Sequence, residues 1–177
     1  LDIRTLGSGN AGATNALRTA GKLPALFTLL GDLLKGLLPV FLARWVGLSE
    51  VWAAAAGGAA VLGHVFAIFL GLRGGKGVAT AGGVFLALAT LPALLTFLSF
   101  FIVVRLSRYV SLGSIVAALF FPPAWWGLGR LGWTYPPSGR LLALASAVAA
   151  LILVKHRGNA KRLWRGTEHR LGTGGKR

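Results

Sequence analysis

Residues 8–18 of the chain combine several groups that bind anions. They read Ser-Gly-Asn-Ala-Gly-Ala-Thr-Asn over residues 8–15, and Arg18 follows three positions later. Glycines let the backbone approach a ligand closely, and consecutive backbone N–H groups can form a concave anion site. Arg18 adds a planar, permanently charged guanidinium. From these residues alone, the stretch is either a phosphate-binding corner or a polar turn before an apolar segment.

A second polar segment, residues 71–80, is also rich in glycine. It reads Gly-Leu-Arg-Gly-Gly-Lys-Gly over residues 71–77 and enters an apolar run through Val-Ala-Thr. A phosphate-binding P-loop would need glycine at Leu70 and a hydroxyl residue at Gly77, so that motif is not matched. Glycines and Lys76 ahead of a helix N-terminus still indicate a phosphate-binding corner.

A third polar segment begins at Lys155 and carries most of the remaining cations. His156 and Asn159 are three residues apart, directly after an apolar run, so a helix would point them the same way. The alternative is a polybasic anchor next to the membrane, without a specific ligand.

The residue inventory limits the chemistry of these segments. There are only four acidic residues and no cysteine. This argues against paired-carboxylate hydrolysis and against thiolate or carboxylate metal sites, and no Ser-His-Asp set can be assembled. The inventory favours binding of phosphate groups, preferably more than one, without a metal or another cofactor.

The composition places the chain in a membrane. Hydrophobic residues make up 55% of it and charged residues only 13%, with a net charge of +15. The cations fall in short clusters between apolar runs, a pattern typical of cytoplasmic loops beside anionic headgroups. Nucleic acid is not expected as a partner, because it needs a soluble basic face.

The apolar runs predict an all-α, polytopic membrane helical bundle that forms a single domain over residues 1–177. The runs cover residues 23–47, 51–70, 78–104, 112–128 and 140–154. About 20 residues of helix cross the hydrocarbon, so most of these runs are long enough. Residues 170–177 are expected to form a disordered tail. The chain begins with Leu1 and contains no methionine, which indicates a fragment or a trimmed form.

Two spans carry polar residues. Asp32 and Lys35 are three residues apart in the first span, so we expect them to pair on one helix face, as a structural ion pair rather than a catalytic one. His64 lies late in the second span and is either a functional residue or a hydrogen-bonded structural one.

The run 78–104 leaves two topologies open because Pro92 interrupts it. If the run crosses once, the Gly-Gly-Lys-Gly segment and the basic tail lie on opposite faces of the membrane. If it folds back near Pro92 as two short helices, they lie on the same face, together with Arg105 and Arg108. The excess of cations in cytoplasmic segments favours the second topology, which gives about six helices.

The three polar segments together resemble the bacterial acyl-phosphate:glycerol-3-phosphate acyltransferases of the inner membrane. The first family motif, Ser-Gly-Asn-x-Gly-Ala-Thr-Asn followed by Arg, resembles residues 8–18. The second, Gly-Gly-Lys-Gly-Val-Ala-Thr, resembles residues 74–80, and the third, His-x-x-Asn-x-x-Arg-Leu with Gly-x-Glu beyond, resembles residues 156–168. The chain departs from the family at Ala67, where proline is frequent, and at Arg73, where lysine is common.

The resemblance implies a reaction and a set of site residues. An acyl group would pass from acyl phosphate to the 1-hydroxyl of sn-glycerol 3-phosphate, giving lysophosphatidate and phosphate, a step of phospholipid biosynthesis. The implied catalytic residues are Ser8, Arg18, Lys76, His156 and Asn159. The implied substrate-binding residues are Gly9, Asn10, Thr14, Asn15, Gly74, Gly75, Gly77, Thr80 and Arg162.

The family also implies a location and a topology. The protein would be a multi-pass protein of the bacterial inner membrane with its motifs on the cytoplasmic face, and it would need no protein partner. A further helix ahead of residue 8 would give seven helices in the complete protein. Either His156 or a substrate phosphate oxygen would accept the hydroxyl proton.

Two other functions are weighed against this one. Acyl-CoA-dependent acyltransferases carry a His-x-x-x-x-Asp motif, which none of the three histidines here begins. A small phosphate or organophosphate carrier would use the same cations to pass an anion across the membrane. The clustering of the basic motifs on one face, rather than near mid-membrane, counts against a carrier.

Overall fold

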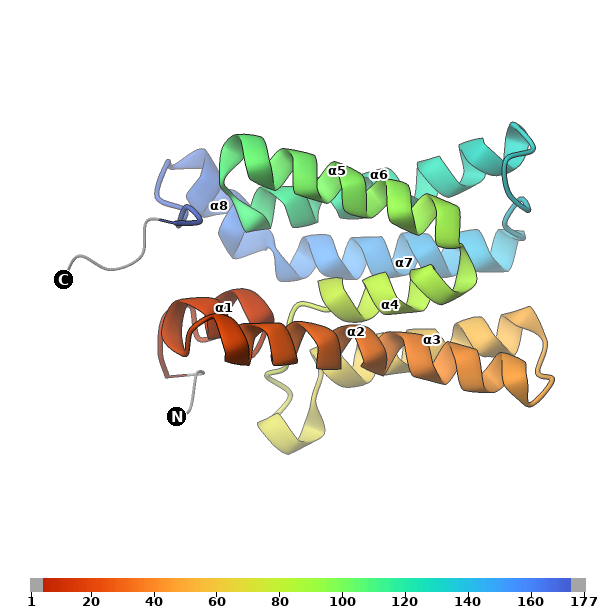
Figure 1. Ribbon diagram of the computed structural model, residues 1–177, viewed down its shortest axis with the longest axis horizontal. Coiled ribbons are helices and arrows are strands. Elements are labelled where there is room, and N and C mark those ends of the chain that lie inside the picture. The colour runs from red at the N-terminus through yellow and green to blue at the C-terminus, as the bar shows by residue number, and fades with distance from the viewer. Residues whose placement is uncertain (1–4, 173–177) are drawn as a thin grey trace. The chain divides into compact units, whose positions relative to one another are not determined.

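The computed structural model describes residues 5–172, and over this range the regular structure is entirely helical, as the sequence predicted (Figure 1). A short 3-10 turn, η1, covers Ile68–Leu70. The helices are α1 (Ala13–Thr19), α2 (Lys22–Trp45), α3 (Glu50–Val65), α4 (Val78–Leu88), α5 (Thr90–Ser107), α6 (Val110–Arg130), α7 (Gly139–Lys155) and α8 (Arg157–Trp164).

The helices divide into two compact units, Leu1–Leu88 with α1–α4 and Ala89–Arg177 with α5–α8. The single membrane domain expected from the sequence stays a prediction. Part of the predicted tail, residues 173–177, lies outside the described residues. The preceding residues Arg170 and Leu171 contact the turn between α5 and α6.

The helices identify a multi-pass membrane protein. Among residues 5–172, four segments are long and apolar enough to cross a bilayer: α2, Glu50–Leu70, α5 and α6. The pair α7 and α8, bent by 55° at their junction, raises the number to five if it forms one span. Large apolar side chains such as Phe27, Phe41 and Phe101 are exposed on these helices, as expected for surfaces that contact lipid.

The apolar run 78–104 is divided into two helices, as the sequence suggested, but the break comes at Ala89 rather than at Pro92. Ala89 leaves the helical region with φ −147° and ψ 71°. Pro92 lies in the first turn of α5, where its missing N–H needs no intrahelical acceptor. The two pieces are unequal: α4 has 11 residues and α5 has 18. Whether the polar segments share one membrane face stays a prediction.

The core of the first unit depends on glycines that bring helix backbones together. A Cβ atom added to Gly36 of α2 would overlap the carbonyl oxygen of Thr80 in α4, and one added to Gly83 of α4 would overlap the carbonyl oxygen of Leu33 in α2. The two helices therefore contact each other backbone to backbone. Small residues at helix contacts are a common means of close packing in lipid.

We expect Gly36→Ala to destabilise the protein by about 1–3 kcal/mol, because the added methyl group must push α4 away from α2. Gly31→Ala is the matched control, since Gly31 lies on the same helix with nothing within 4 Å of its added Cβ. Thermal unfolding in detergent measures both. Equal midpoints for the two variants would contradict the close contact.

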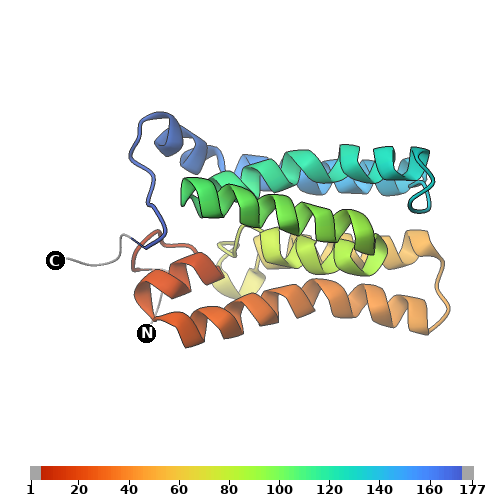
Figure 2. The same cartoon turned by 45° about the horizontal axis from the view of Figure 1, so that its top comes forward.

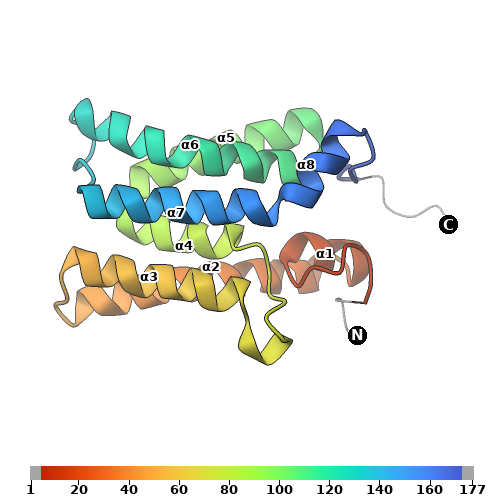
Figure 3. The same cartoon turned by 180° about the vertical axis from the view of Figure 1, so that it is seen from behind.

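Each unit gathers its polar segments at one end. In the first unit, α2 and α3 are joined by the short turn 46–49 and run in opposite directions, so the end of α3 returns to the beginning of α2 (Figure 2). The loop 71–77 and α1 therefore lie at the same end of α2 (Figure 3). In the second unit, the α5–α6 turn and the α7–α8 junction share one end for the same reason.

Candidate active site

The loop before α1 is closed by the side chain of Asn15. Asn15 is 1% exposed; its Oδ1 accepts from the backbone N–H of Ser8 at 2.9 Å, and its Nδ2 donates to the carbonyl of Leu6 at 3.1 Å. Gly7 adopts a left-handed φ of 60°, and a Cβ there would overlap Asn15 Oδ1. Asn15, expected to bind substrate, thus holds the loop in shape.

Several N–H groups of this loop are already engaged. The N–H of Ser8 donates to Asn15, that of Gly9 donates to the carbonyl of Leu6, and that of Gly12 donates to Asn10 Oδ1. These amides therefore do not form the open anion nest that the glycines suggested. The side chains of Ser8 and Arg18 are exposed, and Thr14 is half-buried. An anion at this end would meet side chains rather than those three amides.

The Gly-Gly-Lys-Gly loop lies against the end of α3. Gly75 and Gly77 are buried, whereas Gly74 and Lys76 are half-buried. Gly77 has a φ of 82°, which favours glycine, and its carbonyl accepts from Ala81 N at 2.8 Å at the start of α4. The expected order of loop and helix is therefore confirmed, with Lys76 directly before the turn into α4.

Thr80 follows this loop in the first turn of α4. It is fully buried, and its Oγ1 has no hydrogen-bond partner among the described residues. Buried hydroxyl groups are nearly always paired. Its carbonyl oxygen faces Gly36 of α2, so the backbone at this position is fixed by helix packing.

In the second unit, the third motif is organised around the carboxylate of Glu168. Its Oε1 accepts from Asn159 Nδ2 at 2.7 Å and from Ser111 Oγ at 2.9 Å, and its Oε2 accepts from Arg162 Nε at 2.7 Å. The Glu168 side chain is 3% exposed, and that of Arg162 is 41% exposed. Two residues expected to act on substrate, Asn159 and Arg162, are thus held by one acid.

These contacts keep Glu168 charged. Burial by itself would raise the pKa of Glu168, but the hydrogen bonds from Asn159, Arg162 and Ser111, with the charge of Arg162, together hold the pKa below its ordinary value. The carboxylate therefore stays ionised at neutral pH, and it offsets part of the positive charge of the tail.

His156 lies at the junction of α7 and α8 and is buried. Its Nδ1 is 2.8 Å from the carbonyl oxygen of Ile152. Because a carbonyl only accepts, Nδ1 carries the proton, and in the neutral ring the lone pair lies on Nε2. This tautomer presents Nε2 as the nitrogen able to accept a proton.

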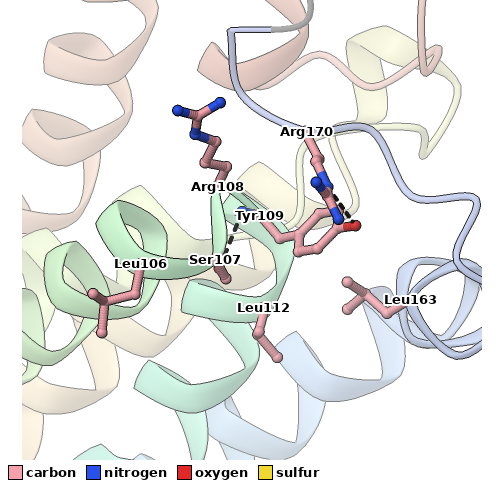
Figure 4. A pocket seen from close by; sticks show the side chains of 7 residues that line it. All are labelled: Leu106, Ser107, Arg108, Tyr109, Leu112, Leu163 and Arg170. Carbon is pink, nitrogen blue, oxygen red and sulfur yellow. Dashed lines mark hydrogen bonds between the residues drawn. The ribbon is translucent and has the colours of Figure 1, made fainter.

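An open pocket of about 620 Å³ lies in the second unit where α5, α6 and α8 meet (Figure 4). Within it, Arg170 Nε donates to Tyr109 Oη at 2.9 Å, and the guanidinium lies 5.3 Å from the ring centre. The lining combines cations with aliphatic side chains, so it suits an anionic group beside a hydrocarbon chain. The lining residues are Leu106, Ser107, Arg108, Tyr109, Leu112, Leu163 and Arg170.

The predicted residues form two groups, one in each unit. Ser8, Asn15 and their neighbours share one end of the first unit with Lys76, and His156 shares one end of the second with Asn159 and Arg162. The expectation that Arg18 and Lys76 meet His156 at one site stays a prediction. No cluster of three metal-binding side chains occurs among residues 5–172.

Comparison with known proteins relates nearly the whole chain to one family. The family model described as "Glycerol-3-phosphate acyltransferase" matches residues 1–166. A glycerol-3-phosphate acyltransferase of Geobacter sulfurreducens is 48% identical over 171 residues, 97% of this chain and 84% of the relative. This chain belongs to the glycerol-3-phosphate acyltransferase family.

Solved structures agree with this family assignment. A crystal structure of PlsY (YgiH), an integral membrane glycerol 3-phosphate acyltransferase, in its glycerol 3-phosphate form has a TM-score of 0.86 and 42% identity, over 98% of this chain and 84% of that one. The lysophosphatidic acid form has a TM-score of 0.82 and 42% identity, over 94% of this chain and 82% of that one. The resemblance found in the sequence is confirmed.

Not every residue that shapes the site of this glycerol-3-phosphate acyltransferase can be recognised in the sequence. Ser111 lies in an apolar helix with no motif around it, and only the fold brings it to Glu168, 57 residues away. Gly7 precedes the first motif and gave no signal beyond being a glycine. Glu168 belongs to the Gly-x-Glu part of the third motif. Its position among the cations of the tail is the sequence signal that it neutralises some of them.

Proposed function

We propose that this acyltransferase moves a fatty acyl group from acyl phosphate to the 1-hydroxyl of sn-glycerol 3-phosphate, releasing lysophosphatidate and inorganic phosphate. The observation that carries the proposal is the match over nearly the whole chain to PlsY, whose two solved forms are named for glycerol 3-phosphate and lysophosphatidic acid. These are the acceptor and the product of such a transfer. The use of acyl phosphate as the donor is implied by the resemblance of the three motifs.

The reaction makes modest demands on the protein. The 1-hydroxyl oxygen attacks the acyl carbonyl carbon, the bond between that carbon and the phosphate oxygen breaks, and phosphate leaves with the bonding electrons. Acyl phosphate already carries a good leaving group once its charge is neutralised. The protein must therefore position two phosphates and stabilise the developing charge.

Lys76 and Arg18 are proposed to supply that charge. Lys76 is half-buried and lies between the buried glycines Gly75 and Gly77. The side chains of Ser8 and Asn10, with the loop glycines Gly74, Gly75 and Gly77, are proposed to hold the acyl-phosphate end, whereas the Gly9 amide is already bonded to Leu6. The hydroxyl of Thr80 lacks a partner in the described chain, and a phosphate oxygen would give it an acceptor.

Glycerol 3-phosphate is proposed to bind to His156 and Asn159, with Arg162 beside them. The hydrogen bonds of Asn159 and Arg162 to Glu168 support this role, because side chains that are already fixed lose little entropy on binding. Asn15 holds the loop of the first motif from α1, and the half-buried Thr14 is proposed to contact the substrate.

Charge supports a cytoplasmic location for the site. In each unit the end that carries the motifs holds more cations than the opposite end, where Trp45, Trp52, Trp133 and Tyr135 are exposed, as at a membrane interface. The cations at the motif ends are Arg18, Lys22, Arg73, Lys76, Arg105, Arg108, Lys155, Arg157, Lys161, Arg162, Arg165 and Arg170. We propose that these ends face the cytoplasm at the bacterial inner membrane. No metal, cofactor or protein partner enters the proposal.

The test is donor choice by the reconstituted protein. We expect lysophosphatidate to form from glycerol 3-phosphate with palmitoyl phosphate and not with palmitoyl-CoA. Use of the CoA ester alone would overturn the proposal. A carrier would instead move radiolabelled glycerol 3-phosphate into sealed vesicles without any acyl donor, and that result would favour the alternative function.

His156 provides a separate prediction about the proton. If its Nε2 accepts the hydroxyl proton, His156→Ala and His156→Gln should both lower kcat about 100-fold or more, because the glutamine amide cannot take a proton. Steady-state rates with palmitoyl phosphate measure the loss. High activity in His156→Gln alone would assign His156 a hydrogen-bonding role and the proton to a substrate phosphate oxygen.

A further inference from the structure

A buried charged cluster lies in the first unit outside the three motifs. Asp32 is 5% exposed within the apolar helix α2, where an uncompensated carboxylate is costly. Its Oδ1 is 3.1 Å from Lys35 Nζ, so the ion pair expected from the sequence is confirmed. The same oxygen is 3.4 Å from Nδ1 of His64, which comes from α3.

The two partners of Asp32 differ in their surroundings. The Lys35 side chain is 64% exposed and belongs to the same helix, so it supplies charge from the outside. The His64 side chain is only 10% exposed and belongs to the neighbouring helix. His64 therefore connects Asp32 to the end of α3, directly before the Gly-Gly-Lys-Gly loop.

The other edge of His64 faces that loop. A Cβ atom on Gly75 would overlap Nε2 of the His64 ring, and one on Gly74 would overlap the His64 carbonyl oxygen. The backbone of these two glycines thus lies directly against His64, and no larger residue fits there. Lys76 is the next residue along the chain.

We propose that Asp32 and His64 are positioning residues for the loop that carries Lys76. Asp32 holds the imidazole with Nδ1 toward α2, and the opposite ring edge then supports the backbone of Gly75, while Gly74 packs on the carbonyl oxygen of His64. Neither residue touches substrate in this arrangement; both act through Lys76. The inference rests on the proposed function in one respect, that Lys76 contacts a substrate phosphate.

Two variants separate loop support from charge compensation. His64→Asn keeps a short amide donor near Asp32 but removes the ring edge that faces Gly75. It should lower kcat/KM by about 10- to 100-fold, mainly through kcat, because small displacements of a catalytic group are costly. Lys35→Gln removes the exposed charge partner of the same carboxylate and should change kcat/KM by less than about threefold.

A double-mutant cycle tests whether His64 acts through Lys76. In a Lys76→Ala background, His64→Asn should cost less than about twofold, because no charge remains for the loop to position. An equal factor in both backgrounds would indicate a merely structural role and would overturn the proposal. An equal loss in Lys35→Gln would also overturn it, since compensation of the Asp32 charge would then be the property that matters.

Amide hydrogen exchange of residues 71–77 gives a readout independent of the reaction. Without substrate, exchange in this loop should be faster in His64→Asn than in the wild type and unchanged in Lys35→Gln. Unchanged exchange in His64→Asn would overturn the positioning role even in a fully active enzyme. If exchange is faster in His64→Asn but the wild-type protein does not use acyl phosphate, the proposed function is contradicted and the positioning role of His64 is not.

Discussion

Replacing Lys76 by alanine is expected to lower kcat for acyl transfer about 100-fold or more while the protein remains folded. Lys76 follows two glycines, Gly74 and Gly75, that pack on His64. It precedes Gly77, whose φ of 82° turns the chain into α4. Because the backbone that carries this charge is fixed, the loop needs little reorganisation when negative charge develops on the leaving phosphate. Initial rates with palmitoyl phosphate and glycerol 3-phosphate measure the effect.

Lys22→Ala is the matched control for this experiment. Lys22 is an exposed lysine at the beginning of α2, at the same end of the same unit, and no role in substrate binding is assigned to it. Its loss should leave kcat within about twofold of the wild type if long-range charge is screened by salt. Equal effects of the two substitutions would mean that net positive charge, and not the position of Lys76, drives the reaction.

Glu168→Gln is expected to destabilise the protein by about 2–3 kcal/mol, because hydrogen bonds to a charged acceptor are lost and buried donors are left weakly paired. The midpoint of thermal unfolding should fall by about 5–10 °C. Glu50→Gln is the control: Glu50 is an exposed glutamate that pairs with Arg44 at 3.2 Å, and its replacement should cost less than about 1 kcal/mol.

The effect of Glu168 should depend on pH in a defined direction. Since its pKa is lower in the folded protein than in the unfolded chain, the stabilisation is complete above the ordinary value of 4.5 and is lost as the pH falls through the native pKa. The difference in stability between wild type and Glu168→Gln should therefore be constant at neutral pH and shrink in acid. A difference that grows on acidification would contradict the role of the carboxylate.

Local sequence signals predicted the helices and one ion pair well. Long apolar runs indicated α2, α3, α5, α6 and α7, and the spacing of Asp32 and Lys35 predicted their contact because an α-helix fixes the geometry of residues three apart. The break in the run 78–104 was predicted less well. Proline is the conspicuous residue, but it is tolerated in a first turn, so the break falls at Ala89.

Contacts between distant segments were not accessible from the sequence. His64 approaches Asp32 only because α3 packs on α2, and Ser111 reaches Glu168 only because α6 and the tail share one end of their unit. Asn15 was expected to contact a ligand. The sequence could not distinguish this role from a contact with its own loop, because an asparagine uses the same amide groups for both. The fold directs those groups to Ser8 and Leu6.

The contacts of Glu168 also set an order of events during biosynthesis. Ser111 and Asn159 are synthesised before Glu168, and the carboxylate joins them from 57 and 9 residues further along the chain. While the chain is being inserted, those donors must bond to water or to other groups until residue 168 leaves the ribosome. A chain terminated at Arg165 would contain every residue proposed to touch substrate, yet it would lack the acid that holds Asn159 and Arg162 in place.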